Sequence, residues 1–109
     1  MKKVFISHPY AENPRINSKR VDDICGELLD NHINILPISP LHMFSYFKED
    51  ESNYREEIMK MCLHLINNCD EVYMYLYDEL SKGQKRELEY ATNLDKNIKI
   101  IVKGVNEDV

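Results

Sequence analysis

The sequence is poor in glycine, with only three in 109 residues, and it has no tryptophan. Dinucleotide- and phosphate-binding loops of the G-x-G-x-x-G and G-x-x-x-x-G-K-[ST] types need several glycines at fixed spacing, because the backbone must approach the phosphates closely. Neither motif is present, which argues against both kinds of nucleotide cradle. No H-x-x-x-H pair and no cluster of histidine and cysteine indicates a metal site either. We therefore expect no metal and no other cofactor.

Cysteines and long apolar runs are also scarce. The three cysteines, Cys25, Cys62 and Cys69, form no C-x-x-C pair, and an odd number does not suit a disulfide framework. We expect reduced, mostly buried thiols and a cytoplasmic protein. The two N-terminal lysines precede only a three-residue apolar run, Val4–Ile6, which fits neither a signal peptide nor a membrane span. No contact with a membrane is expected.

Positive charge is in deficit, with 14 basic against 19 acidic residues and a formal net charge of −5. A phosphate backbone would be repelled overall, so polymeric nucleic acid is not an expected partner, whereas a small anion in a local positive pocket is compatible. The length suits one domain, residues 1–109. A core of this size has a thin margin of stability. We therefore expect a homo-oligomer, a dimer or larger, that buries part of the aromatic-rich segment 41–47.

Short β-rich runs alternate with stretches of helical periodicity. The predicted strands cover residues 3–6, 33–38, 71–77 and 97–102, and the predicted helices run to residue 30, from a cap at Ser52 to residue 67, and from Gly83 to about Asn93. This alternation is typical of βαβ units with right-handed crossovers. We predict a three-layer α/β fold of the flavodoxin-like or Rossmann-like type, with a parallel sheet of four to five strands in the order 2-1-3-4.

Ligands of such folds bind at the carboxyl ends of the strands. Three predicted loops leave that edge, "SHPY" (7–10), "SPLH" (39–42) and "DELSKG" (78–83). Their histidines are as compatible with capping a turn as with contacting a ligand, but convergence of the loops favours a pocket. Basic residues near its mouth would meet phosphates. The candidate ligand-binding residues are Ser7, His8, Pro9, Asn13, Arg15, Pro40, His42, Ser81, Gly83 and Arg86.

The segment "SKGQKRELEYA" carries the strongest local signal. Gly83, Glu87 and Ala91 fall on one face of the predicted helix, and the two small residues would let that face approach the sheet. Glu87 would then be partly desolvated at the base of the crevice, which raises a carboxyl pKa and suits a general base or nucleophile. The alternative is that Glu87 is one solvated charge among neighbours such as Glu89.

Four stretches together, "VFISHPY", "PISPLHMF", "NCDEVYMY" and "SKGQKRELEYA", resemble the nucleoside deoxyribosyltransferase-like superfamily over about residues 3–102, and its small bacterial and phage branch most closely. In the enzymes of that superfamily a glutamate on this helix attacks the anomeric carbon and forms a covalent glycosyl intermediate. The resemblance implies Glu87 as the nucleophile and Asp70 as the residue that handles protonation of the base. It implies Tyr10 as the loop aromatic that helps to place the nucleophile.

The sequence departs from the transferases at three points. "DELSKG" stands where they usually have an aspartate directly before the glycine region, Glu89 replaces the small residue of E-x-G-x-A, and the chain is shorter than the transferases, which lend a C-terminal residue to the neighbouring subunit's site. Two functions are therefore open. One is an N-glycosidase or deoxyribosyltransferase-like enzyme acting on the N-glycosidic bond of a nucleoside or nucleotide. The other is a non-catalytic binder that sequesters a nucleotide-derived small molecule; a module without any ligand is the third and weaker interpretation.

Overall fold

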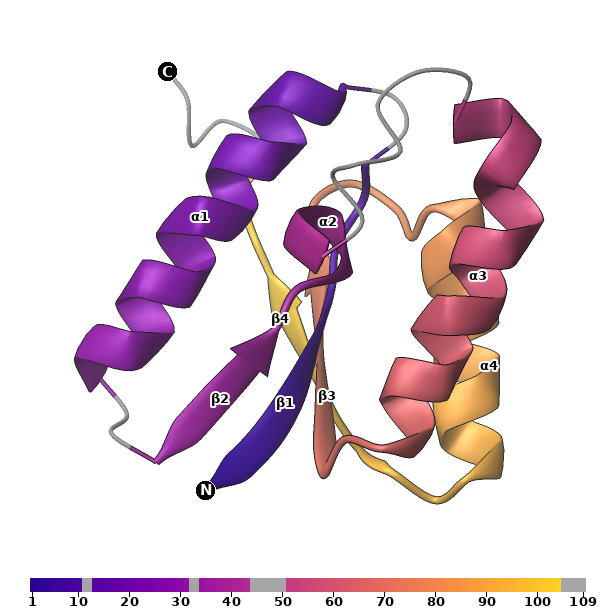
Figure 1. Ribbon diagram of the computed structural model, residues 1–109. Helices are drawn as coiled ribbons and strands as arrows, with labels where there is room; N and C mark the ends of the chain where they lie inside the picture. The colour runs from indigo at the N-terminus through magenta and orange to yellow at the C-terminus, as the bar shows by residue number, and fades with distance from the viewer. Residues whose placement is uncertain (11–12, 32–33, 44–50, 105–109) are drawn as a thin grey trace.

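The computed structural model describes residues 1–10, 13–31, 34–43 and 51–104, with the side chains of residues 51–53 left aside. Strands and helices alternate along the chain, as the sequence predicts (Figure 1). The strands are β1 (Lys2–Ser7), β2 (Ile35–Ile38), β3 (Glu71–Leu76) and β4 (Asn97–Val102), and the helices are α1 (Pro14–Asn31), α2 (Pro40–Met43), α3 (Glu51–Asn67) and α4 (Lys82–Asn93).

The four described strands form one parallel sheet in the order β2-β1-β3-β4, which confirms the predicted topology. Helix α1 covers one face of the sheet and helices α3 and α4 cover the other (Figure 1). From β1 the chain moves outward to β2 on one side, and then to β3 and β4 on the other. The topological switch point therefore lies between β1 and β3, and a crevice is expected at their carboxyl ends.

Alternation along β1 divides the core into two halves. Val4 and Ile6 face α1, whereas Phe5 faces α3 and α4, because successive side chains of a strand point to opposite faces. The α1-side cluster consists of Val4, Ile6, Val21, Ile24, Ile35, Tyr73 and Tyr75. The opposite cluster consists of Phe5, Cys62, Ile66, Cys69, Val72 and Ala91. All three cysteines are free thiols, and burial raises the pKa of Cys62 to about 12.

Two details of the predicted elements are wrong. Residues 40–42 of the predicted "SPLH" loop lie in a short helix, α2, and Ser52 lies inside α3, which begins at Glu51, instead of capping it. Propensity locates helix ends only to within about one or two residues, so a serine near the start does not fix the cap. No helix in the described part of the chain is long and apolar enough to cross a membrane.

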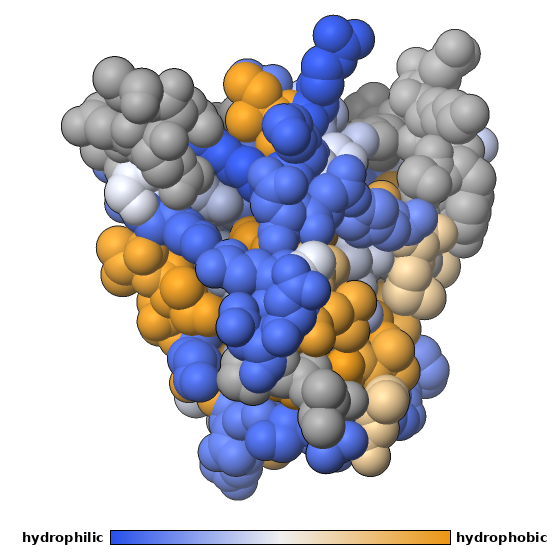
Figure 2. Space-filling view, turned by 90° about the vertical axis from the view of Figure 1, so that its left-hand side faces the viewer, coloured by the Kyte–Doolittle hydropathy of each residue, from blue (hydrophilic) through white to orange (hydrophobic). Residues whose placement is uncertain are grey.

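The outer face of α1 is polar, and apolar surface shows on both sides of it, over β4 and over β2 (Figure 2). Leu36 of β2, which alternates with Ile35 and therefore points to the α3 side of the sheet, is 42% exposed, and Met43 of α2 is 46% exposed. Exposed apolar side chains favour self-association. The predicted interface, residues 41–47, is described only as far as Met43.

The first prediction concerns assembly. Light scattering at micromolar concentration should report at least twice the monomer mass of 12.9 kDa. Met43→Lys should lower that mass, because it puts a charge into the expected interface. Leu94→Lys, at an exposed apolar position that follows α4, is the matched control and should leave the mass unchanged. A monomeric wild type would contradict the expectation.

Candidate functional site

A buried hydrogen bond joins the end of β1 to α4. The hydroxyl of Ser7 donates to Oε1 of Glu87 over 2.6 Å, and the two residues are 0% and 7% exposed. Burial raises the pKa of Glu87 from 4.5 to about 7, and the bond from Ser7 offsets part of that effect. Among the described residues, the hydrogen-bond partner of this carboxyl is the neutral hydroxyl of Ser7. The carboxyl is therefore desolvated, lies at the switch point of the sheet, and keeps its proton to a higher pH than an ordinary glutamate.

Gln84 places this carboxyl. It forms a capping box with Ser81: the Ser81 hydroxyl accepts from the Gln84 amide N–H at 3.1 Å, and the Ser81 N–H donates to Gln84 Oε1 at 3.1 Å. Nε2 of Gln84 then donates to the carbonyl oxygens of Ser7 and Tyr75, at 3.3 and 2.8 Å. The start of α4 is thereby fixed to the ends of β1 and β3, and Glu87 follows one turn later on the same face. The S-x-x-Q pattern in "SKGQ" was the signal that the sequence analysis missed.

The small residues of α4 act differently from the prediction. Ala91 is fully buried in the cluster that contains Val72, so it does permit close packing on the sheet. Gly83 does not face the sheet, because a Cβ added there would meet the terminal methyl of Met59, on α3, at 3.4 Å. That is an ordinary contact with a flexible side chain. The expectation that Gly83 brings α4 close to the sheet is therefore wrong.

His8 turns toward the opposite face of the sheet from Ser7. Its Nδ1 lies 2.7 Å from the Pro9 carbonyl oxygen, which can only accept, so Nδ1 carries the proton. Nε2 then accepts from the Tyr77 hydroxyl at 2.8 Å. Burial lowers the pKa of His8 from 6.5 to about 4, and Arg20 and Lys103 add to the effect. At neutral pH His8 is thus a neutral ring with a fixed tautomer.

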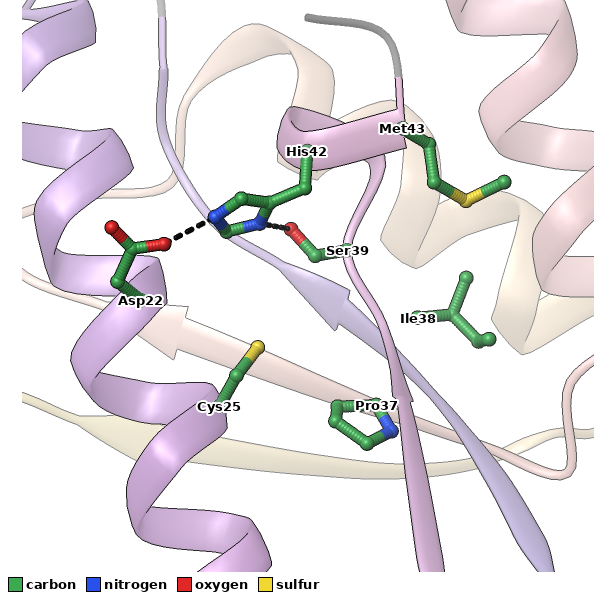
Figure 3. A pocket seen from close by; sticks show the side chains of 7 residues that line it. All are labelled: Asp22, Cys25, Pro37, Ile38, Ser39, His42 and Met43. Atoms are coloured by element: carbon green, nitrogen blue, oxygen red, sulfur yellow. Dashed lines mark hydrogen bonds and ion pairs between the residues drawn. The ribbon is translucent and has the colours of Figure 1, made fainter.

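A second feature of this edge is an open hollow of about 400 Å³ between α1, the end of β2 and α2 (Figure 3). In it His42 bonds Ser39 Oγ through Nδ1, at 2.7 Å, and Asp22 through Nε2, which links α2 to α1. The other lining residues are Cys25, Pro37, Ile38 and Met43. Glu87 does not line this hollow. We place the candidate site at Ser7 and Glu87, because a desolvated carboxyl at a switch point is a stronger indicator of chemistry than volume.

Most predicted site residues follow the carboxyl ends of the strands. Ser7 is the last residue of β1, and His8 and Pro9 follow it; Pro40 and His42 follow β2, and Ser81 and Gly83 follow β3. Tyr10 is partly buried, and its carbonyl oxygen accepts from the Asn13 N–H and from Asn17 Nδ2. The carbonyl of Asn13 accepts the first bond of α1, from Asn17, and Arg15 is exposed in the first turn of that helix.

The structure does not bring Asp70 to Glu87. Oδ2 of Asp70 accepts from the Lys3 N–H at 2.7 Å, at the amino ends of β1 and β3. Lys3 precedes Ser7 by four residues of strand, which is roughly 13 Å. Because β3 begins at Glu71, a residue directly before it lies at the edge opposite the crevice.

Arg86 is also away from the crevice. Its two terminal nitrogens bind the carboxylate of Glu56, on α3, at 3.0 and 3.4 Å. A carboxylate that the sequence analysis did not single out, Asp78, lies at the correct edge, two residues beyond the end of β3, and is exposed. Its position after a strand at the carboxyl edge was a usable signal.

This arrangement defines a doubly wound α/β protein with a buried carboxyl at its switch point. The chain belongs to the family described as a domain of unknown function, DUF7768, whose model matches residues 2–101. A search of the curated proteins found none that matches. The assignment to a small bacterial and phage branch stays a prediction.

Two solved structures are similar to the chain as folds. One is the 2-desoxiribosyltransferase from Leishmania mexicana, with a TM-score of 0.71 and 18% identity over 94% of this chain and 65% of that one. The other is the 2-deoxyribosyltransferase from Bacillus psychrosaccharolyticus, with a TM-score of 0.69 and 20% identity over 92% of this chain and 72% of that one. The chain thus spans just under two thirds of the Leishmania protein. The similarity confirms the deoxyribosyltransferase-like fold.

The second prediction concerns pH and stability. Because the pKa of Glu87 is raised from 4.5 to about 7, the folded state holds a proton that the unfolded state has lost, and stability falls as pH rises through this window. The loss is on the order of 3 kcal/mol. His8 acts in the opposite sense, since its lowered pKa makes stability rise between about pH 4 and 6.5. The two effects partly cancel in the wild type.

Glu87→Gln removes only one of these opposing effects. Urea unfolding between about pH 4.5 and 8 should show the variant gaining stability over the wild type as pH rises, by on the order of 3 kcal/mol in total. The stability of Glu87→Gln should itself rise with pH, because His8 is unchanged in this variant. This rise should be smaller in the Glu87→Gln, His8→Asn double variant. Parallel curves for the wild type and Glu87→Gln would show that the carboxyl does not titrate in this window.

The third prediction compares two adjacent residues of α4. Gln84→Met leaves the carbonyls of Ser7 and Tyr75 without their donor, and should destabilise the fold by about 2–4 kcal/mol. Gly83→Ala adds a methyl against Met59 and reduces the freedom of the unfolded chain, so it should be neutral or stabilise by up to about 1 kcal/mol. Urea unfolding measures both. Equal destabilisation by the two variants would contradict this account.

Proposed function

We propose that this protein processes nucleosides or nucleotides by cleaving or transferring at the N-glycosidic bond, with Glu87 as the nucleophile. The observation that carries the proposal is the desolvated Glu87 carboxyl at the switch point, held by Ser7 at 2.6 Å and with its pKa raised to about 7. The fold shared with two 2-deoxyribosyltransferases supports it. A buried carboxyl destabilises a small domain, so a chemical role gives a reason for its presence.

The proposed reaction uses the ionised form of Glu87. Ser7 binds Oε1, and Oε2 attacks the anomeric carbon of the sugar. The C–N bond breaks, the base leaves with the electron pair and takes up a proton, and a glycosyl ester remains on Glu87. Water, or a second base, then attacks the same carbon and releases the carboxylate. Water gives hydrolysis, and a second base gives transfer.

A carboxylate that passes a proton from solvent to the departing base is proposed at the same edge of the sheet. Asp78, which is exposed and closely follows β3, lies at the crevice edge, whereas Asp70 is bound to the backbone of Lys3 at the opposite edge. His8 does not suit this role, because both of its ring nitrogens are engaged, by the Pro9 carbonyl and the Tyr77 hydroxyl, and its ring lies on the opposite side of the sheet from Glu87. Its fixed neutral ring, with Tyr10 nearby in the chain, is proposed instead as part of the pocket wall.

The second candidate function is a non-catalytic binder of a nucleotide-derived small molecule. It is favoured by the low exposure of Glu87, 7%, and by a pKa that leaves much of it protonated at neutral pH. A protonated carboxyl donates one hydrogen bond and accepts others, which suits sugar hydroxyls. The same pocket then serves recognition without turnover.

The fourth prediction separates the two functions through Glu87→Gln. Base release from a panel of nucleosides and their 5′-monophosphates should fall by several orders of magnitude, while affinity changes little, because the amide keeps the shape but loses the attacking charge. The wild-type rate should rise with pH up to about 7, as the carboxyl ionises. Glu89→Gln, an exposed glutamate on the same helix, is the control and should behave as the wild type.

The binder gives a different pattern in the same experiment. No base is released by the wild type, and Glu87→Gln weakens ligand affinity in calorimetry by about 1–3 kcal/mol. Unchanged turnover together with unchanged affinity in Glu87→Gln would remove Glu87 from the site and overturn the proposal.

A further inference from the structure

Two cations lie on aromatic rings at the α1 side of the crevice edge. The guanidinium carbon of Arg20, on α1, is 4.3 Å from the centroid of the Tyr77 ring. Nζ of Lys103, directly after β4, is 5.9 Å from the centroid of the Tyr75 ring. Both contacts are within the range of a cation–π interaction, about 6 Å, and that of Lys103 is near its limit. A protein with a net charge of −5 thus places two positive charges on neighbouring rings at this edge.

The pKa of His8 depends on the charges near it. Its ring packs against Tyr77, at 5.0 Å between centroids, and lies 6.3 Å from Tyr75. Among the described residues, the charged groups that shift its pKa are the two cations, and both lower it. The carboxylates of the β3–α4 loop, Asp78 and Glu79, are exposed and are not among those groups. The described charges that act on His8 are therefore positive.

The cluster is within reach of a ligand. Arg20, Tyr77, His8 and Lys103 are each partly exposed. Three of the four follow carboxyl ends of neighbouring strands: His8 follows β1, Tyr77 follows β3 and Lys103 follows β4. The cluster thus shares the crevice edge with Glu87. It lies on the α1 side of the sheet, whereas Glu87 lies on the α4 side.

We propose that Arg20 and Lys103, with His8 and Tyr77 between them, form a subsite for a phosphate group, so that the substrate is a nucleoside monophosphate instead of an uncharged nucleoside. The substrate assignment rests on the proposed function, but anion binding does not. Ser7 and His8 are consecutive, with Cα atoms about 3.8 Å apart, and face opposite sides. A nucleotide carries its anomeric carbon and its 5′-phosphate at opposite ends of one sugar, which matches this division.

Proton uptake should accompany binding of the phosphate. A dianion between the two cations offsets their effect on His8 and raises the pKa of its ring. The proton taken from solvent enters at Nε2, because Nδ1 already donates to Pro9. Nε2 then donates to the Tyr77 hydroxyl, which turns its own hydrogen toward the phosphate. Binding and protonation of His8 are thus linked.

Calorimetry on three proteins tests the subsite. Each of four deoxynucleoside 5′-monophosphates is compared with its nucleoside, on the wild type, Lys103→Gln and Lys99→Gln. Lys99 is a matched control: it lies four residues earlier, inside β4, with Nζ 5.0 Å from the Tyr73 centroid. We expect a wild-type preference for the monophosphate of at least about tenfold. Lys103→Gln should abolish that preference without changing nucleoside affinity, and Lys99→Gln should keep it.

A titration of His8 by NMR gives an independent result with inorganic phosphate as the probe. The pKa of His8 should rise with phosphate in the wild type and in Lys99→Gln, and much less in Lys103→Gln. The proposal is overturned if nucleoside and monophosphate bind equally, or if Lys103→Gln and Lys99→Gln behave alike. A rise with inorganic phosphate but no preference for the monophosphate also overturns it, since the anion site would then be separate from the substrate.

The proposed reaction is tested separately, by measuring base release. Base released from nucleosides and monophosphates with equal efficiency would keep the proposed reaction and reject the subsite. A monophosphate preference that depends on Lys103, without any base release, would keep the subsite and reject the reaction.

Discussion

The side chain of Gln84 makes the contacts on which the rest of the site depends. It is 1% exposed, closes the capping box of α4 with Ser81, and donates to the carbonyls at the ends of β1 and β3. Neighbouring strands of a doubly wound sheet separate at the switch point. Carbonyl groups near their ends then need hydrogen-bond donors from outside the sheet. One amide satisfies both and fixes the start of a helix to them. The position of Glu87 follows from that attachment.

The two sides of the crevice edge differ in chemistry because Ser7 and His8, at the end of β1, point to opposite sides of the sheet. Ser7 faces the buried carboxyl of Glu87, whereas His8 lies on the partly exposed α1 side of the sheet, near Arg20 and Lys103. Burial is the main reason why both groups favour their uncharged forms, and the two cations add to this effect only at His8. A ligand that spanned the edge would meet the Ser7–Glu87 pair on one side and the two cations on the other.

The fold was predictable from the sequence because the alternation of strands and helices is local and strongly periodic, as in the β1 and β4 runs. Burial of Glu87 followed from helical spacing, although Gly83 proved to face Met59. The role of Gln84 was not predictable, because its acceptors lie 77 and 9 residues away and only the folded sheet brings them together. Asp70 was expected in the site from the resemblance alone, although the predicted third strand began at residue 71, as β3 does, and a residue directly before that strand lies at the edge opposite the crevice.

The alternating orientation of Ser7 and His8 also limits how β1 can change in length. Its register with β2 and β3 is set by Val4 and Phe5, which are fully buried on opposite faces. Deleting or inserting one residue between Phe5 and Ser7 would exchange the two faces, presenting the imidazole to Glu87 and the hydroxyl to the cations. Replacements of Val4 or Phe5 that keep size therefore leave this division intact, whereas a change in the length of the strand inverts it.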